Sequence, residues 1–322
     1  MSPNVVSVIP KMAHFRVSLT GMSTCNKNIK CEPMLPRAKR GFRNNTQQIE
    51  QSNKYNKMTT WKIDQIGKRP RLNNPILIEG LPGIGNVGKV AIDFLIDELK
   101  AKKIYEITSH SFPHSVFVNE DNLVELPKIE MFYKQFNGKK QDLLLLGGDV
   151  QPTDEVSSYE FSEKILDMLR EFRGREVITL GGIGLAEMPK KPKVYCTGNN
   201  RKIIQKYKDA MVDDKLYGIV GPIVGVSGLL VGLAKRRNMD AIAFLAETYG
   251  HPMYLGIKGA VELLKFFDRK LGLKINMKKL HEEIKEIEED ILHRTEQIGE
   301  VARQTALKKL KGRFGEGVDY IG

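Results

Sequence analysis

Short apolar runs alternate with stretches of helical spacing from residue 75 onward, and this alternation restricts the fold more than any other feature of the sequence. The leucine run within residues 142–146 is apolar on both faces, which is typical of a strand in the middle of a parallel sheet covered by helices. We therefore predict an α/β fold with a mostly parallel sheet flanked by helices and an antiparallel excursion between residues 112 and 136. Other predicted strands lie at residues 75–79, 104–108, 177–180, 193–197 and 241–245. Predicted helices lie at residues 89–100, 154–172, 201–207 and 257–271, and a further helix that ends at Arg237 begins within the glycine-rich residues 221–228.

The composition is that of a globular protein with a sizeable core. The chain has 322 residues, of which 41% are hydrophobic, so it can fold without disulfides or structural metals. Cys25, Cys31 and Cys196 are too few and too scattered for a disulfide framework or a four-cysteine zinc site, and we expect a cytoplasmic protein. The longest apolar stretch, residues 223–234, is shorter than the roughly 20 residues of a membrane-spanning helix, so no membrane partner is expected.

The net charge of +12 comes mainly from the start of the chain. Ten of the 51 Lys and Arg residues lie within residues 1–60, where the acidic residues are Glu32 and Glu50. We interpret residues 1–57 as a basic disordered extension outside the fold, with Met58 as a possible working initiator, because they carry too little apolar surface to fold. A transit peptide or a nucleic-acid-binding arm are the alternatives. The rest of the chain is nearly balanced in charge, so no nucleic-acid partner is expected.

The end of the chain differs from the predicted core domain at residues 58–272. Residues 273–310 are charged, with apolar side chains at heptad-like spacing, which predicts an amphipathic helical segment. This segment either docks on its own domain or mediates self-association. The glycine-rich residues 311–322 are expected to form a flexible tail.

A glycine-rich turn follows the first predicted strand. The spacing Gly83-x-Gly85-x-x-Gly88 matches a dinucleotide-binding fingerprint, but the next strand does not end in the acidic residue that binds the ribose. The same turn resembles a phosphate-binding P-loop in which Val90 replaces the required Ser or Thr hydroxyl. Either the turn binds a nucleotide, or its glycines let a helix pack closely on the sheet. We favour the second interpretation and predict no cofactor.

Polar and glycine residues follow several predicted strands, and the carboxyl edge of a parallel sheet is where α/β proteins usually bind ligands. Glu247 and His251 are either an acid and base pair or a polar cap on a strand end. His110 and His114 have no carboxylate or cysteine at ligand spacing, so no metal site is predicted, and no catalytic residue is assigned. The possible ligand pocket comprises Gly83, Gly85, Gly88, Asp149, Gly182, Gly225 and Glu247.

Five of these segments, taken together and in order, resemble the PAC2 family of proteasome assembly chaperones, and specifically its archaeal members. The resemblance covers about residues 62 to 310. It is carried by Pro82-Gly-Ile-Gly-Asn-Val-Gly88, Gly147-Gly-Asp-Val-Gln-Pro152, Gly181-Gly182, Gly221-Pro222 with Gly225 and Gly228, and Glu247-Thr248.

This resemblance implies a fold similar to purine nucleoside phosphorylases, no established catalytic activity, homo-oligomerisation and binding to the α-subunits in the α-ring of the 20S proteasome. Family members typically dock through a C-terminal hydrophobic-Tyr-any tail. Here Tyr320 stands one place early, before Ile321 and Gly322, and follows an aspartate, Asp319. We predict that these last three residues form the partner-binding tail. The alternative is a small-molecule enzyme, phosphorylase-like or ATP-dependent ligase-like, that binds a phosphate-containing ligand at the glycine-rich loops.

Overall fold

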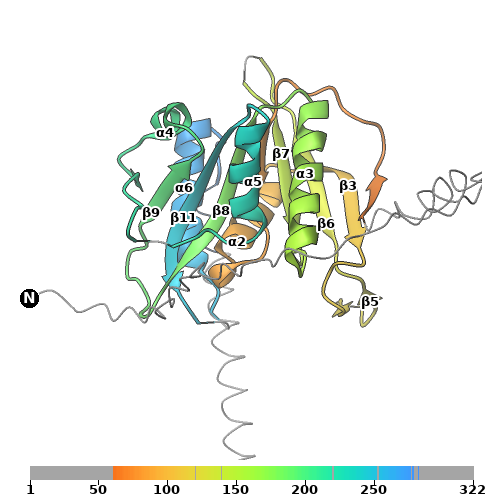
Figure 1. Ribbon diagram of the computed structural model, residues 1–322, viewed down its shortest axis with the longest axis horizontal. Helices are drawn as coiled ribbons and strands as arrows, with labels where there is room; N and C mark the ends of the chain where they lie inside the picture. Colours follow the sequence, from red (N-terminus) through yellow and green to blue (C-terminus); the bar gives the residue numbers. More distant parts are fainter. Residues whose placement is uncertain are drawn as a thin grey trace, which may run out of the picture. The chain divides into compact units, whose positions relative to one another are not determined.

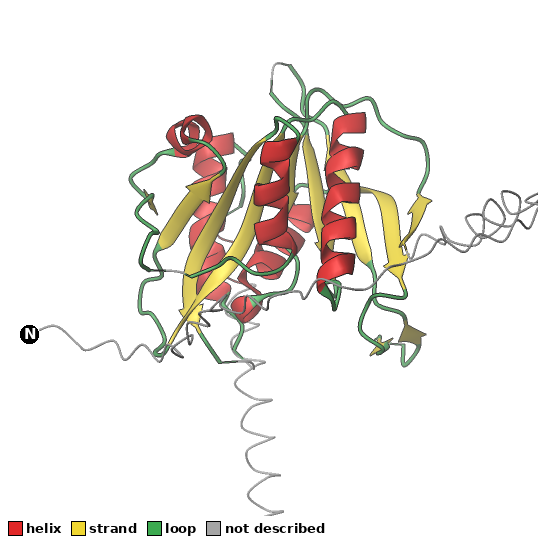
Figure 2. Cartoon of the chain, viewed as in Figure 1, coloured by secondary structure: helices red, strands yellow, loops and turns green. Residues whose placement is uncertain are grey.

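A nine-stranded sheet forms the centre of the protein, as the computed structural model shows in Figures 1 and 2. The structure describes residues 61–276 apart from 120, 139, 220 and 252–253, together with residues 278 and 282. The extension predicted at residues 1–57 and the tail predicted at 311–322 lie outside the described residues. So does nearly all of the helical segment predicted at residues 273–310.

The strands do not follow one another across the sheet in chain order. The order is β1-β3-β6-β7-β2-β8-β11-β9-β10, which places β2 at the centre. Two further strands, β4 (Phe117–Val118) and β5 (Val124–Glu125), pair only with each other. The strands of the large sheet are β1 (Trp61–Gln65), β2 (Ile76–Glu79), β3 (Lys102–Ser109), β6 (Ile129–Lys134), β7 (Leu143–Gly148), β8 (Glu176–Leu185), β9 (Val194–Gly198), β10 (Val212–Asp213) and β11 (Asp240–Tyr249).

The antiparallel excursion predicted between residues 112 and 136 is confirmed by β4, β5 and β6. The prediction of a mostly parallel sheet was wrong, because β1 and β9 are antiparallel to their neighbours as well and the sheet is mixed. The central strands β7, β2, β8 and β11 are parallel, and β10 is parallel to β9. The pairs β1–β3, β3–β6, β6–β7 and β9–β11 are antiparallel. Parallel neighbours need a crossover of a dozen or more residues, usually a helix, and no described helix separates β3 from β6 or β6 from β7.

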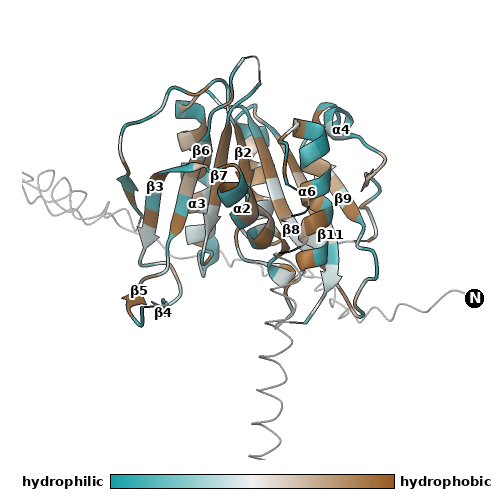
Figure 3. Ribbon diagram, turned by 180° about the vertical axis from the view of Figure 1, so that it is seen from behind, coloured by the Kyte–Doolittle hydropathy of each residue, from teal (hydrophilic) through white to brown (hydrophobic). Residues whose placement is uncertain are grey.

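Helices cover both faces of the sheet. Figure 1 shows α3 (Glu155–Glu171) and α5 (Val226–Arg236) on one face, and Figure 3 shows α2 (Val87–Glu98) and α6 (Ile257–Leu271) on the other. The α2 and α6 face also includes the short helix α4 (Arg201–Tyr207), whose Ile203 and Tyr207 belong to the same core cluster. None of the helices in the described part of the chain has the length and apolar character that crossing a membrane would take.

The core has two halves because successive side chains of a strand point to opposite faces. In β2, Ile76 and Ile78 pack under α2 and α6, whereas Leu77 packs under α3 and α5. The leucines of β7 divide in the same way. All are buried, which confirms that the continuous apolar runs mark strands covered on both faces.

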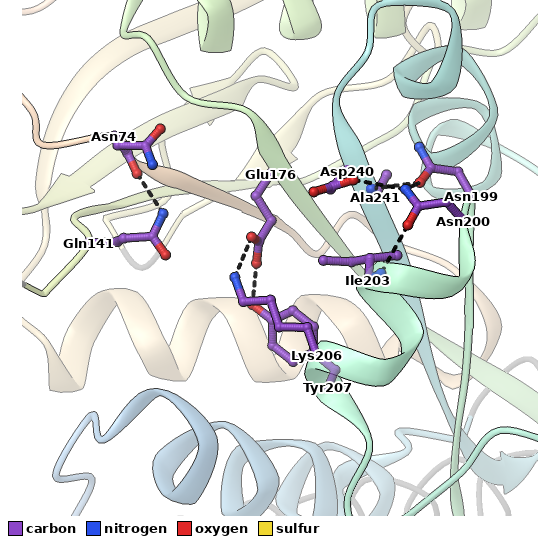
Figure 4. A network of polar contacts seen from close by, with 10 residues as sticks. All are labelled: Asn74, Gln141, Glu176, Asn199, Asn200, Ile203, Lys206, Tyr207, Asp240 and Ala241. Atoms are coloured by element: carbon purple, nitrogen blue, oxygen red, sulfur yellow. Dashed lines mark hydrogen bonds and ion pairs between the residues drawn. The ribbon is translucent and has the colours of Figure 1, made fainter.

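The amino ends of β8 and β11 hold α4 through a polar network (Figure 4). The buried Tyr207 hydroxyl and the Lys206 ammonium both donate to the Glu176 carboxylate. Burial, together with the negative charge of Glu176, raises the pKa of Tyr207. Asn200 caps the helix by accepting from the Ile203 backbone N–H at 3.0 Å, and its amide donates to Asp240 at 2.8 Å. These contacts fasten a helix of seven residues that would not form alone.

The strands β8 and β11 extend several residues beyond the predicted runs. Gly181 and Gly182 lie inside β8, opposite Leu245 and Ala246 of β11, and Glu247 is still within its strand. The glycines break the apolar pattern in the sequence, but backbone pairing does not depend on side chains. The sheet therefore continues to the edge where the glycine-rich turn lies.

Helix α2 begins unusually close to the sheet. A Cβ atom added to Gly88 would lie 2.4 Å from the carbonyl oxygen of Leu180 in β8, which is closer than real Cβ contacts. The start of the helix can therefore rest directly on the strand backbone only because residue 88 has no side chain. Gly232 in α5 is a natural comparison, since no atom beyond the neighbouring backbone of its own helix lies within 4 Å of its added Cβ.

We expect Gly88→Ala to lower the free energy of unfolding by about 1–3 kcal/mol, because the new methyl group forces α2 away from β8. Gly232→Ala is the matched control, and it should leave stability unchanged or raise it by up to about 1 kcal/mol through helix propensity. Urea unfolding followed by circular dichroism measures both. Equal effects of the two substitutions would contradict the importance of this contact.

Candidate functional site

A cavity of about 380 Å³ lies at the carboxyl end of the parallel strands, beside the glycine-rich turn and the start of α5. Four of the seven predicted pocket residues line it, namely Gly83, Gly88, Gly182 and Gly225. Most of the other lining side chains are apolar, and the polar ones are Gln151 and Ser227. Within the described part of the chain the lining includes no Lys or Arg, so a phosphate group would find no side-chain cation among these residues. This chemistry suits an apolar group better than a phosphate.

Gly85 lies outside the cavity lining and serves the packing of the turn. Its φ of 59° is in the left-handed region, which favours glycine. An added Cβ would lie 2.7 Å from the Thr248 hydroxyl, and the Gly85 carbonyl accepts from the Gly256 N–H at 2.6 Å. Gly182 is similar, because its added Cβ would lie 2.2 Å from the Ile84 carbonyl oxygen. Close packing of the turn on β8 and β11 accounts for both glycines without a ligand.

Glu247 and Asp149 also lie outside the cavity lining. Glu247 accepts from the Lys193 backbone N–H at 2.9 Å and from the Tyr195 hydroxyl at 3.2 Å, so its carboxylate fastens β11 to β9. Asp149 follows β7 and is near Asp93 of α2. Burial raises the pKa of Asp93, and the charge of Asp149 adds to that rise.

Gln151 connects two walls of the cavity and was not singled out from the sequence. Its amide nitrogen donates to the Pro82 carbonyl at 2.5 Å, and its amide oxygen accepts from the Val226 N–H at 3.0 Å. One side chain thus joins the glycine-rich turn to the first turn of α5. Because Gln151 already occupies the Val226 donor, this helix terminus has one backbone N–H fewer to offer an anion.

Glu79, the last residue of β2, is the second residue that sequence reasoning missed. It is fully buried, and its Oε1 accepts from the Leu81 N–H at 3.0 Å and from the Ser227 hydroxyl at 3.2 Å. Its Oε2 has no hydrogen-bond partner among the described residues. The hydroxyl of Thr179, its register partner on β8, is also buried without one in this part of the chain.

The buried position of Glu79 changes its acidity. Burial raises its pKa from 4.5 to about 7, although the hydrogen bonds from Leu81 and Ser227 act in the opposite direction. Protonation of Glu79 removes the buried negative charge, so the carboxyl group costs less to keep out of water. The only signal in the sequence was an acid at the end of an apolar strand, and such an acid is usually exposed.

The structure is that of an α/β protein with helices on both faces of a mixed sheet and a cavity, walled partly by glycines, at the carboxyl edge of that sheet. Comparison with known proteins identifies the family to which the chain belongs. The PAC2 family model matches residues 77–293, so the chain belongs to the PAC2 family. Its resemblance to this family in five sequence segments is thereby confirmed.

Solved structures of archaeal proteins are similar over most of the chain. The crystal structure of Pyrococcus furiosus PbaB, an archaeal proteasome activator, is 39% identical with a TM-score of 0.66, covering 74% of this chain and 100% of that one. Pyrococcus furiosus PbaA, an archaeal homolog of proteasome-assembly chaperone, shares the fold at 23% identity and a TM-score of 0.59, covering 78% and 98%. An uncharacterized protein of Methanocaldococcus jannaschii is 29% identical over 73% of this chain and 87% of its own.

The buried carboxyl should make stability depend on pH. Unfolded Glu79 ionises near 4.5 and folded Glu79 near 7, so between these values folding binds a proton and stability falls as pH rises. The expected loss is about 3 kcal/mol, with no further loss above the folded pKa. Glu79→Gln removes this charge, keeps the acceptor for Leu81 and Ser227, and should raise the free energy of unfolding by about 1–3 kcal/mol at pH 8.

Chemical denaturation between pH 4 and 8 measures the difference between the two proteins. The control is Glu187→Gln, the same change at an exposed glutamate. Its pH profile should follow that of the wild type. If the Glu79→Gln profile does so too, Glu79 has the same pKa in the folded and the unfolded protein, and our assignment is wrong.

Proposed function

We propose that this protein binds the α-ring of the 20S proteasome as a homo-oligomer and assists proteasome assembly or activation. The observation that carries the proposal is the 39% identity with an archaeal proteasome activator over the whole of that chain. Membership of the PAC2 family supports it. The same proposal includes a fold similar to that of purine nucleoside phosphorylases. It also includes an amphipathic helical segment at residues 273–310.

The contact with the α-ring would be made in part by the last three residues, Tyr320, Ile321 and Gly322. They offer an aromatic ring, an aliphatic side chain and a terminal carboxylate. A tail of this kind binds weakly by itself, because a flexible segment loses conformational entropy when it docks. Several tails on one oligomer would compensate, since the first contact raises the effective concentration of the others. An oligomeric state is therefore part of the proposal.

A phosphate-binding enzyme is the alternative that the glycine motifs suggested. Such an enzyme would need a charged side chain to bind the phosphate. The described cavity lining offers apolar surface and two neutral polar side chains, Gln151 and Ser227. We therefore place the activity of this protein in protein binding.

Deleting residues 320–322 should weaken binding to 20S proteasome from the same organism by at least about tenfold, because each tail loses its aromatic and carboxylate contacts. Biolayer interferometry with immobilised proteasome measures the change. A chain that lacks residues 1–57 is the control and should bind as the full chain does. Unchanged binding after the tail deletion would exclude the tail as a docking element, and no binding by the full chain would overturn the proposed function.

Assembly and activation give different results with the same proteins. An activator should increase peptide hydrolysis by mature 20S proteasome, whereas an assembly factor should increase the yield of complete particles from separated α- and β-subunits. Each assay uses the tail-deleted chain as its control. The pair of results assigns the step at which the protein acts.

A further inference from the structure

A small pocket lies at the amino ends of the central strands, on the opposite edge of the sheet from the glycine-rich turn. Its volume is about 220 Å³. It is lined by the first residues of β2 and β7, the last residues of α4 and α6, and short stretches of chain beside them. Pockets for drug-sized ligands usually have volumes of about 300–1,000 Å³, so this one suits a smaller molecule.

Three lysines from different parts of the chain line this pocket: Lys140 before β7, Lys206 of α4 and Lys270 of α6. The ammonium groups of Lys206 and Lys270 lie 5.2 and 6.0 Å from the centre of the Tyr207 ring, so both are close to the same wall. Lys206 is paired with Glu176 (Figure 4). No carboxylate belongs to the lining in the described part of the chain.

The other two lysines, Lys140 and Lys270, have only neutral hydrogen-bond partners. Lys140 donates to the Gly272 carbonyl at 2.8 Å, and Lys270 donates to the Lys208 carbonyl at 3.5 Å. Neither forms an ion pair with another described residue. An ammonium group has three donors and each of these uses one on a carbonyl, so both lysines can still donate to a ligand.

The surroundings of these two lysines make their positive charge unfavourable. Both side chains are half-buried. Burial lowers the pKa of Lys140, and the charge of Lys274 lowers it further, whereas Asp268 acts in the opposite direction. Charges removed from water are usually compensated by an opposite charge. A bound anion would supply that compensation here.

We infer that this pocket binds a phosphate group, either as inorganic phosphate or as part of a small organic phosphate. A phosphate monoester carries a charge of about −1.5 to −2 at neutral pH and several acceptor oxygens, so it can accept from Lys140 and Lys270 together. A single carboxylate would compensate one lysine and leave the other. The apolar walls, which include Ile76, Leu143 and Leu273, suit a small organic body on the phosphate.

This site differs from the cavity beside the glycine-rich turn in place and in chemistry. None of the described residues that line that cavity is a lysine or an arginine. The inference involves binding alone and no reaction. A phosphate held between Lys140 and Lys270 would join the chain before β7 to the end of α6, so it should stabilise the amino edge of the sheet.

Isothermal titration calorimetry of the full chain tests the inference with three ligands: inorganic phosphate, glycerol phosphate and succinate. The titrations use about 0.15 M NaCl, where charges more than about 8 Å apart are largely screened. We expect both phosphates to bind at one site per chain and succinate, a dicarboxylate, to bind at least about tenfold more weakly. Tighter binding of glycerol phosphate would assign an organic phosphate as the ligand, and equal binding would assign inorganic phosphate.

A variant with Lys140→Gln and Lys270→Gln should raise the dissociation constant for phosphate at least about tenfold, because two charged donors are lost. The matched control is Lys164→Gln with Lys235→Gln, which removes the same charge on α3 and α5 and should change affinity less than about twofold. Circular dichroism checks that each variant is folded.

A second variant keeps all three lysines. Gln141 also lines the pocket, and Gln141→Glu places a carboxylate beside the lysines. This change should weaken phosphate binding at least about tenfold through repulsion while the folded structure is retained.

Three results would overturn the inference. They are no phosphate binding by the wild type, succinate binding as tight as phosphate binding, and equal loss of affinity in the lysine variant and its control. Unchanged affinity in the Gln141→Glu variant would also overturn it, because the anion would then bind elsewhere on the chain.

Discussion

The close approach of the glycine-rich turn to the sheet determines the position of everything at the carboxyl edge. An added Cβ on Gly80 would lie 2.3 Å from the Gly88 carbonyl oxygen, and one on Gly88 would be almost as close to Leu180. These backbone contacts place the start of α2 directly on β8. They also bring the turn against Gly182 and, through Gln151, against the first turn of α5. The cavity is the space left between these elements, and its shape depends on the absence of side chains around it.

Much of the fold could be predicted from the sequence because burial on both faces leaves a clear pattern. The predicted limits of α4 and α6 coincide with the observed ones, and the central strands lie where the apolar runs are. Strand direction was harder, since it depends on the connections between strands and not on the residues within them. Strand β1 was missed because only Trp61 of its five residues is fully buried, and β10 because it has two residues. The apolar–polar alternation of β1 covers only Trp61 to Asp64, and β10 is too short to show any alternation.

The candidate site was only partly predictable. Glycine spacing identified the turn, because close backbone approach and positive φ leave a mark on the local sequence. The roles of Glu79 and Gln151 depend on contacts with Ser227 and Val226, which lie 148 and 75 residues away in the chain. No local pattern reports that α5 will cover the end of β2 and remove a carboxyl group from water. That burial, and not the residue type, gives Glu79 a pKa near neutrality.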